Sequence, residues 1–160
     1  MERCFAWDAD LVNGEYDRTY YFADFANYLS TFVENGYVPR HPDALRVIAN
    51  DDMTVTLNAG KMFMDGYMYE NTEPRILSID PADGVLSRID RIAITWTKSR
   101  KDIISNVLKG NPSYNPVPQE IRRNADYKDY IVADIEVKAG AIRILQKDIT
   151  DQRLNDEVCG

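Results

Sequence analysis

Histidine and cysteine are scarce in this chain. Its 160 residues include one histidine, His41, and two cysteines, Cys4 and Cys159, near opposite ends. A Ser-His-Asp or Cys-His catalytic set would have to use His41, and the Gly-x-Ser-x-Gly pattern of a nucleophile elbow is missing. No Cys-x-x-Cys spacing indicates a zinc site or a redox pair. We therefore interpret His41 as a loop residue between two prolines. We expect both cysteines to be free thiols, with a disulfide between them as the alternative. We also expect that the chain is not an enzyme and binds no cofactor.

Long apolar runs are also missing. No stretch approaches the ~20 apolar residues of a membrane-spanning helix, and residues 1–5 lack the apolar run of a secretion signal. The hydrophobic share of 44% and the charged share of 28% are ordinary for a globular domain with a core. We expect a chain that is made in a cytoplasm, stays soluble and does not insert into a membrane.

Positive charge is outweighed by negative charge. The chain has 19 Lys and Arg against 26 Asp and Glu, which gives a formal net charge of -7. Such a chain as a whole repels the phosphates of nucleic acids. The densest basic cluster, formed by Lys98, Arg100 and Lys101, falls in a predicted hairpin turn. We therefore expect no nucleic-acid partner.

Aromatic residues crowd the first 36 positions. Asp24 can cap a helix by accepting from the backbone N–H groups of its first turn, and Gly36 can end it in the left-handed conformation. The residues between them predict an amphipathic helix of about three turns. Its apolar face should pack on the rest of the chain, with a second subunit as the alternative. The apolar positions of this face are Phe25, Tyr28, Leu29, Phe32 and Val33.

From Tyr37 onward the hydrophobic period changes from that of a helix to that of a strand. The sequence therefore predicts a mainly β fold, an antiparallel β-sandwich of about seven to nine strands with one N-terminal amphipathic helix. We expect an aromatic segment with the helix over 1–36, the sandwich over 37–146, and a polar segment over 147–160 that leaves the sheet. The predicted strands include 53–57, 61–69, 75–79, 89–97, 102–109, 127–137 and 142–146. Alternation along 61–69 predicts one face with Met62, Met64 and Met68 and another with Phe63, Tyr67 and Tyr69. Along 127–137 it predicts one face with Ile131, Ala133, Ile135 and Val137.

Paired carboxylates are the remaining candidates for chemistry. Asp8 with Asp10, and Asp51 with Asp52, could flank a sugar in a glycoside hydrolase or hold a cation. Both pairs stand beside turn-forming residues, and aspartates in turns bond their own backbone. We therefore favour turn formation for both pairs.

Asp90 has the parity of a core residue. In the predicted strand it lies on the same face as Ile92, Ile94 and Trp96, which should point into the core. A carboxylate on that face must be paired, because burying it alone would cost several kcal/mol. A catalytic acid is the alternative to a structural pair. The candidate partners are Arg88, Arg91 and Arg153.

Two further features suggest contacts with other molecules. Tyr67, Tyr69 and Tyr114 are among the 10 tyrosines, and exposed tyrosines can stack on sugars or anchor protein interfaces. The strand 102–109 is apolar on both faces, although a sandwich strand needs only one apolar face. The interface candidates are Phe25, Tyr28, Phe32, Ile104 and Leu108.

Five segments, in order, carry a resemblance to a known family. They are 60–71 (GKMFMDGYMYEN), 79–84 (IDPADG), 88–92 (RIDRI), 133–141 (ADIEVKAGA) and 148–154 (DITDQRL). Together they resemble the N-terminal module of baseplate and tail-fibre proteins, upper baseplate or receptor-binding proteins, of phages and prophages of Gram-positive bacteria. The resemblance covers roughly residues 14–160.

This resemblance implies a structural virion component of a phage tail tip, assembled in the cytoplasm of the host bacterium. Such a module docks on the tail and presents a receptor-binding segment. The implied partners are copies of itself, in a homotrimer, and other tail or baseplate proteins. It implies no catalysis. The alternative function is a carbohydrate-binding module that recognises glycans of the host cell wall.

Overall fold

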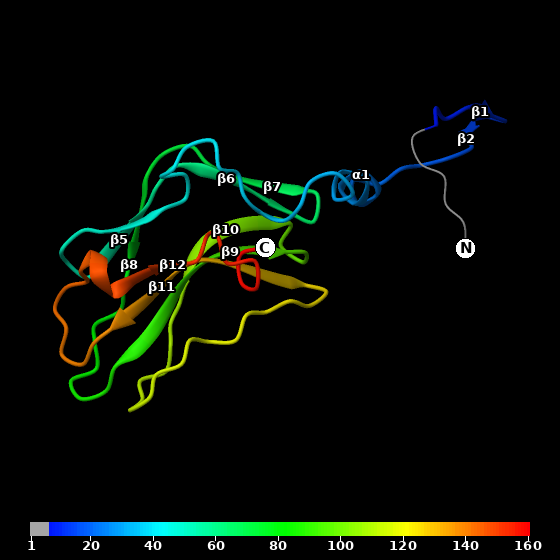
Figure 1. Ribbon diagram of the computed structural model, residues 1–160. Helices are drawn as coiled ribbons and strands as arrows, with labels where there is room; N and C mark the ends of the chain where they lie inside the picture. Colours follow the sequence, from blue (N-terminus) through cyan, green and yellow to red (C-terminus); the bar gives the residue numbers. More distant parts are fainter. Residues whose placement is uncertain (1–6) are drawn as a thin grey trace.

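The computed structural model describes residues 7–160, and twelve strands in this range form four antiparallel sheets. One layer is a four-stranded sheet in the order β10-β9-β11-β12 (Figure 1). Its strands are β9 (Arg88–Thr97), β10 (Asp102–Leu108), β11 (Tyr127–Val137) and β12 (Ile149–Asp151). The predicted hairpin over 89–109 and the predicted strand over 127–137 are confirmed to within one residue.

Two three-stranded sheets make the opposite layer. One is ordered β3-β6-β7, with strands β3 (Gly36–Tyr37), β6 (Gly60–Met64) and β7 (Tyr67–Asn71). The other is ordered β4-β5-β8, with strands β4 (Val47–Ala49), β5 (Thr54–Leu57) and β8 (Arg75–Ser78). Apolar residues from both layers meet in one core, among them Val55, Leu57, Met62, Ile94 and Ile135. Within residues 7–160 the mainly β antiparallel sandwich with a single α-helix is confirmed, and short strands raise the strand number above nine.

The predicted strand 61–69 is a hairpin of two strands. Asp65 and Gly66 form its two-residue turn, and both have positive φ, 49° and 79°. Asp-Gly is a favoured pair for this turn because both residues tolerate that conformation. The turn reverses the parity, so that Met62 pairs with the buried Tyr69 while Met68 lies 48% exposed. The prediction that Met68 shares a face with Met62 is therefore wrong.

A β-bulge interrupts the predicted face of β11. Between Ile131 and Ala133 the register against β9 shifts by one residue. An extra residue in one strand turns the following side chains to the other face. Val132 and Ala133 both belong to the core, whereas Ile131 is buried outside it. The prediction that Ile131 shares the core face of Ala133 and Ile135 is therefore wrong.

The C-terminal segment stays on the sandwich. The predicted strand 142–146 does not form, and β12 pairs with β11 in its place, after the short 3-10 helix η1 (Gln146–Asp148). Further along, the backbone N–H of Ile131 donates to the carbonyl of Val158 at 2.9 Å, and Cys159 is 1% exposed. The expectation that residues 147–160 leave the sheet is wrong, because hydrogen bonds hold a polar segment here that has no strand periodicity. Burial raises the pKa of the Cys159 thiol to about 11.

The helix α1 (Phe22–Leu29) begins and ends earlier than predicted. Asp24 lies inside its first turn, where the carboxylate accepts the backbone N–H of Tyr21 at 2.9 Å. After Leu29 the hydroxyls of Ser30 and Thr31 donate to carbonyls three residues back, at 2.8 and 2.7 Å. Such bonds offer the backbone an alternative to the helical ladder. The short strands β1 (Leu11–Val12) and β2 (Glu15–Tyr16) precede the helix.

Helix α1 touches the sandwich at the turn between β6 and β7. A Cβ added at Gly66 would lie 1.8 Å from the carbonyl oxygen of Ala26. Asn35 holds the same turn from the other side, since its side chain accepts the backbone N–H of Asp65 at 2.7 Å and donates to the Asp65 carboxylate at 3.2 Å. Close backbone approach therefore requires glycine at position 66.

We predict that Gly66→Ala lowers the free energy of unfolding by roughly 2–3 kcal/mol, because it adds a steric clash to an unfavourable backbone conformation. Gly140→Ala is the matched control, since Gly140 has φ +67° and nothing within 4 Å of its added Cβ. This control should lose only about 1 kcal/mol. Urea unfolding measures both changes, and equal losses would contradict the close approach of the helix.

Candidate functional site: an N-terminal arm and a cavity at its base

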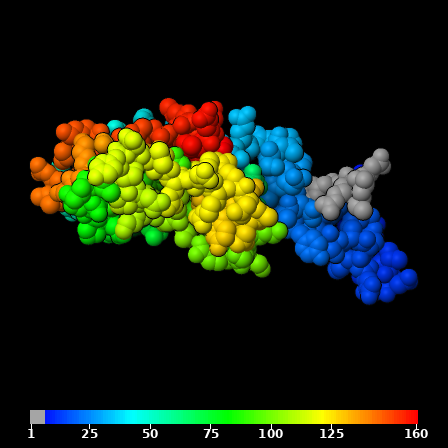
Figure 2. Space-filling view, turned by 90° about the horizontal axis from the view of Figure 1, so that it is seen from below, coloured from blue at the N-terminus to red at the C-terminus, as the bar shows by residue number. Residues whose placement is uncertain are grey.

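Residues 7–21, here called the arm, project from the sandwich (Figures 1 and 2). The β1–β2 hairpin turns at Asn13 and Gly14, and the backbone N–H of Trp7 donates to the Tyr20 hydroxyl at 3.1 Å. Between residues 7 and 29 only Ala26 is buried. The large exposed side chains of the arm are Trp7, Leu11, Val12, Tyr16, Tyr20 and Tyr21.

The arm is acidic. It carries Asp8, Asp10, Glu15 and Asp17 against one cation, Arg18. The Arg18 guanidinium pairs with the Asp17 carboxylate at 2.5 Å and lowers the pKa of that carboxyl to about 2. The other three carboxylates give the arm its net negative charge.

Three of the five residues of the predicted apolar face lie in solvent, whereas Leu29 and Val33 are partly buried. Phe25 and Tyr28 are each 46% exposed and Phe32 is 70% exposed. The rings of Tyr28 and Phe32 meet edge to face with centroids 5.0 Å apart. The expectation that this face packs on the rest of the chain is therefore wrong for these three aromatic residues. Phe22 and Ala26 contact the sandwich in their place.

A cavity of about 650 Å³ lies where the helix meets the sandwich. Its wall is aromatic: the Tyr67 ring stands 5.5 Å from the Phe22 ring and 5.6 Å from the Trp96 ring, and Tyr69 completes the lining. Three elements supply these rings, namely α1, β7 and the end of β9. The sequence marked Tyr67 and Tyr69 as a shared face but did not predict the cavity. The signal that could have placed it was the Asp65-Gly66 turn, which brings β7 beside β6.

The rim of the cavity carries an excess of positive charge. Glu70 pairs with Lys61 at 3.0 Å, and Asp102 pairs with Arg100 at 3.4 Å. Lys98 and Lys101 also line the cavity, and neither pairs with a carboxylate of residues 7–160. The basic hairpin turn noted in the sequence is thus part of this rim.

Asp90 pairs with Arg88 inside the sandwich. The Arg88 Nε lies 2.9 Å from Asp90 Oδ1, and the exposed fractions of the two side chains are 2% and 0%. The backbone N–H of Gly110 donates to the same carboxylate oxygen at 2.8 Å. The remaining guanidinium N–H groups donate to the carbonyls of Pro81 and Asp80 at 2.9 and 2.6 Å. Every strong hydrogen-bonding group of this pair has a structural partner, so the pair fits a structural role.

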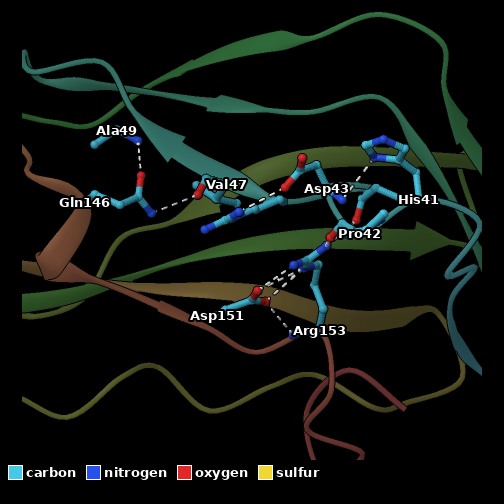
Figure 3. A network of polar contacts seen from close by, with 10 residues as sticks. His41, Pro42, Asp43, Val47, Ala49, Gln146, Asp151 and Arg153 are labelled. Atoms are coloured by element: carbon cyan, nitrogen blue, oxygen red, sulfur yellow. Dashed lines mark hydrogen bonds and ion pairs between the residues drawn. The ribbon is translucent and has the colours of Figure 1, made fainter.

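Arg91 and Arg153, the other candidate partners of Asp90, bind different carboxylates. Arg91 Nε lies 2.9 Å from Asp134 Oδ1. Arg153 pairs with Asp151 at 2.6 Å and donates to the carbonyl of Pro42 at 2.9 Å (Figure 3). The guanidinium thus fastens the C-terminal segment to the loop before β4.

The interface candidates of β10 are half-buried. Strand β10 forms the edge of its sheet, and Ile104 and Leu108 have intermediate exposure. An edge strand presents backbone groups that can pair with another chain. Ile104 and Leu108 therefore stay interface candidates, separate from the aromatic face of the helix.

The remaining candidates do not converge on a site. Asp52 accepts the backbone N–H of Thr54 at 2.7 Å, as expected for a turn, and Asp51 is exposed with φ 59°. His41 Nδ1 accepts the backbone N–H of Asp43 at 3.2 Å in an exposed loop (Figure 3). No group of three or more His, Cys, Asp or Glu within residues 7–160 is placed to hold a metal ion. Cys4 lies outside the described residues, and Cys159 is a free thiol.

We predict that Asp90→Asn lowers the free energy of unfolding by about 3–5 kcal/mol, because it leaves the buried Arg88 without its counter-charge. Asp80→Asn is the matched control: its ion pair with Lys109 is more than half exposed on both sides, so its loss should have little effect. Urea unfolding followed by circular dichroism compares the two variants. An Asp90→Asn variant as stable as the control would contradict the structural role.

Comparison with known proteins gives no relative. No family model, no curated protein and no solved structure matches the chain. Within residues 7–160 no helix is long and apolar enough to cross a membrane. The arm and the cavity are therefore the features from which we infer a function.

Proposed function

We propose that this chain is a structural component of a phage tail tip or baseplate, which docks on the tail and presents a receptor-binding segment. The observation that carries the proposal is the exposed aromatic arm on an otherwise well-packed sandwich. The order of the five motifs described above supports the phage assignment. Copies of the chain itself, in a homotrimer, and other tail proteins are its proposed partners.

The arm has the properties of a segment that binds another protein. An isolated two-stranded hairpin is marginally stable in water, and the strands β1 and β2 have only two residues each. Six large apolar side chains of the arm are exposed, Trp7 to 66% and Tyr16 to 70% among them. Exposed large apolar side chains gathered on one segment are typical of sites of protein association. The arm therefore supports an assembly role.

Immunogold electron microscopy tests the proposal. Particles released by a bacterium that carries this gene are labelled with antibody against the chain, and antibody against the capsid of the same particles serves as the control. We expect gold at the distal end of the tail. Particles without label, or label on the capsid, would overturn the assignment.

A second function, recognition of cell-wall glycans, is favoured by the aromatic lining of the cavity. Rings such as Trp96 and Tyr67 can stack on sugars, and Lys98 and Lys101 at the rim suit an anionic polymer. Retention of the chain on purified host cell-wall polysaccharide, lost on Trp96→Ala, would support this function.

A further inference from the structure

We propose that the arm of one copy docks in the aromatic cavity of a second copy, so that each copy places its arm in the next one. This head-to-tail docking is here called arm exchange. The inference rests on the proposed assembly function and names the partner of the arm. Three observations carry it: the apolar match, the charge match, and the direction in which the arm leaves the sandwich.

The apolar surfaces of the arm and the cavity match. The cavity volume of about 650 Å³ falls in the range of ligand-binding pockets. Its wall includes the aromatic side chains of Phe22, Tyr67, Tyr69 and Trp96. Aromatic side chains pack well on such a wall in tilted or edge-to-face arrangements. The exposed Trp7, Leu11, Val12 and Tyr16 of the arm are side chains of this kind.

The charges of the arm and the rim are opposite. After the Asp17–Arg18 pair, the arm retains Asp8, Asp10 and Glu15, all exposed. After the pairs of Glu70 and Asp102, the rim retains Lys98 and Lys101, which lie on an exposed hairpin turn. Complementary charges at the edge of an interface accelerate encounter and select the partner. The acidic arm is therefore suited to this rim.

The direction of the arm favours a second copy over the chain's own cavity. Phe22, the first residue of the helix, already lines the cavity of its own chain. From there the arm runs away from the sandwich, with the β1–β2 hairpin at the far end (Figure 1). Each copy thus carries an extended donor and an acceptor on different surfaces. A head-to-tail contact of this type closes into a ring when the rotation between copies permits.

A charge-swap experiment on the full chain tests the exchange. The arm variant carries Asp8→Lys, Asp10→Lys and Glu15→Lys, and the rim variant carries Lys98→Glu and Lys101→Glu. All five side chains are exposed, so both variants should fold, which unfolding curves can verify. Sedimentation velocity gives the mass of each variant alone, of their mixture, and of the chain that carries all five changes.

We expect the natural chain to form oligomers that weaken as salt is raised, and each variant alone to be monomeric. Mixing the two variants should restore the oligomer, because each arm then meets a rim of opposite charge. The chain with all five changes should associate like the natural one. Monomeric natural protein throughout the micromolar range, or a mixture that stays monomeric, would overturn arm exchange.

The outcomes also separate this inference from the proposed function. A chain that is monomeric but present at the tail tip overturns the exchange and leaves the assembly role, with another tail protein on the arm. Oligomers by arm exchange in a chain that is missing from virions overturn the phage assignment alone. A monomer that binds cell-wall polysaccharide through Trp96 overturns the exchange in favour of glycan recognition.

Discussion

The buried ion pair of Arg88 and Asp90 fixes the strand on which the rest of the sandwich depends. Strand β9 lies between β10 and β11, and Asp90 is 0% exposed within it. The pair binds the carbonyls of Asp80 and Pro81 before the strand, and the backbone N–H of Gly110 after β10. A shift of β9 by one residue would turn the carboxylate away from all of these partners. Arg88 and Trp96 belong to the same strand, so the register of β9 also places a wall of the cavity.

The sandwich and the arm differ in how far their side chains are covered. In the sandwich, apolar residues of both layers are covered, and buried carboxylates such as Asp90 and Asp129 are paired with arginines. Burial disfavours the charged form of Asp129, but hydrogen bonds from Arg122 and Thr95 outweigh it and hold the pKa of that carboxyl below its usual value. In the arm, aromatic side chains are exposed and the strands are too short to stabilise each other. When a second molecule covers such a surface, apolar area leaves water and the free energy of the system falls.

Sequence periodicity predicted the parts of the fold that depend on one continuous strand. The extent of the strand 127–137 and the parity of Asp90 are examples. Periodicity failed where a single residue changes the parity, at the Asp65-Gly66 turn and at the bulge beside Val132. Both features depend on the local backbone conformation of one or two residues, which the pattern of apolar positions does not reveal.

Contacts between distant residues account for the remaining differences. Arg91 meets Asp134 across 43 positions, and spacing within one strand could not identify that partner. The segment 147–160 is polar, yet Arg153 and Arg123 hold it through backbone carbonyls. The helix face was predicted from its period, but the period does not say which molecule covers it. An apolar stripe looks the same whether its partner is its own chain or another copy.

Hydrogen–deuterium exchange across a range of protein concentrations tests most directly whether the arm is an assembly element. We predict that amide exchange in residues 7–21 and around Trp96 and Lys98 slows together as concentration rises, while exchange in β11 stays constant. Slow exchange of the arm at the lowest concentration would mean that its own sandwich already covers it. Fast exchange of the arm at every concentration would mean that no second copy does.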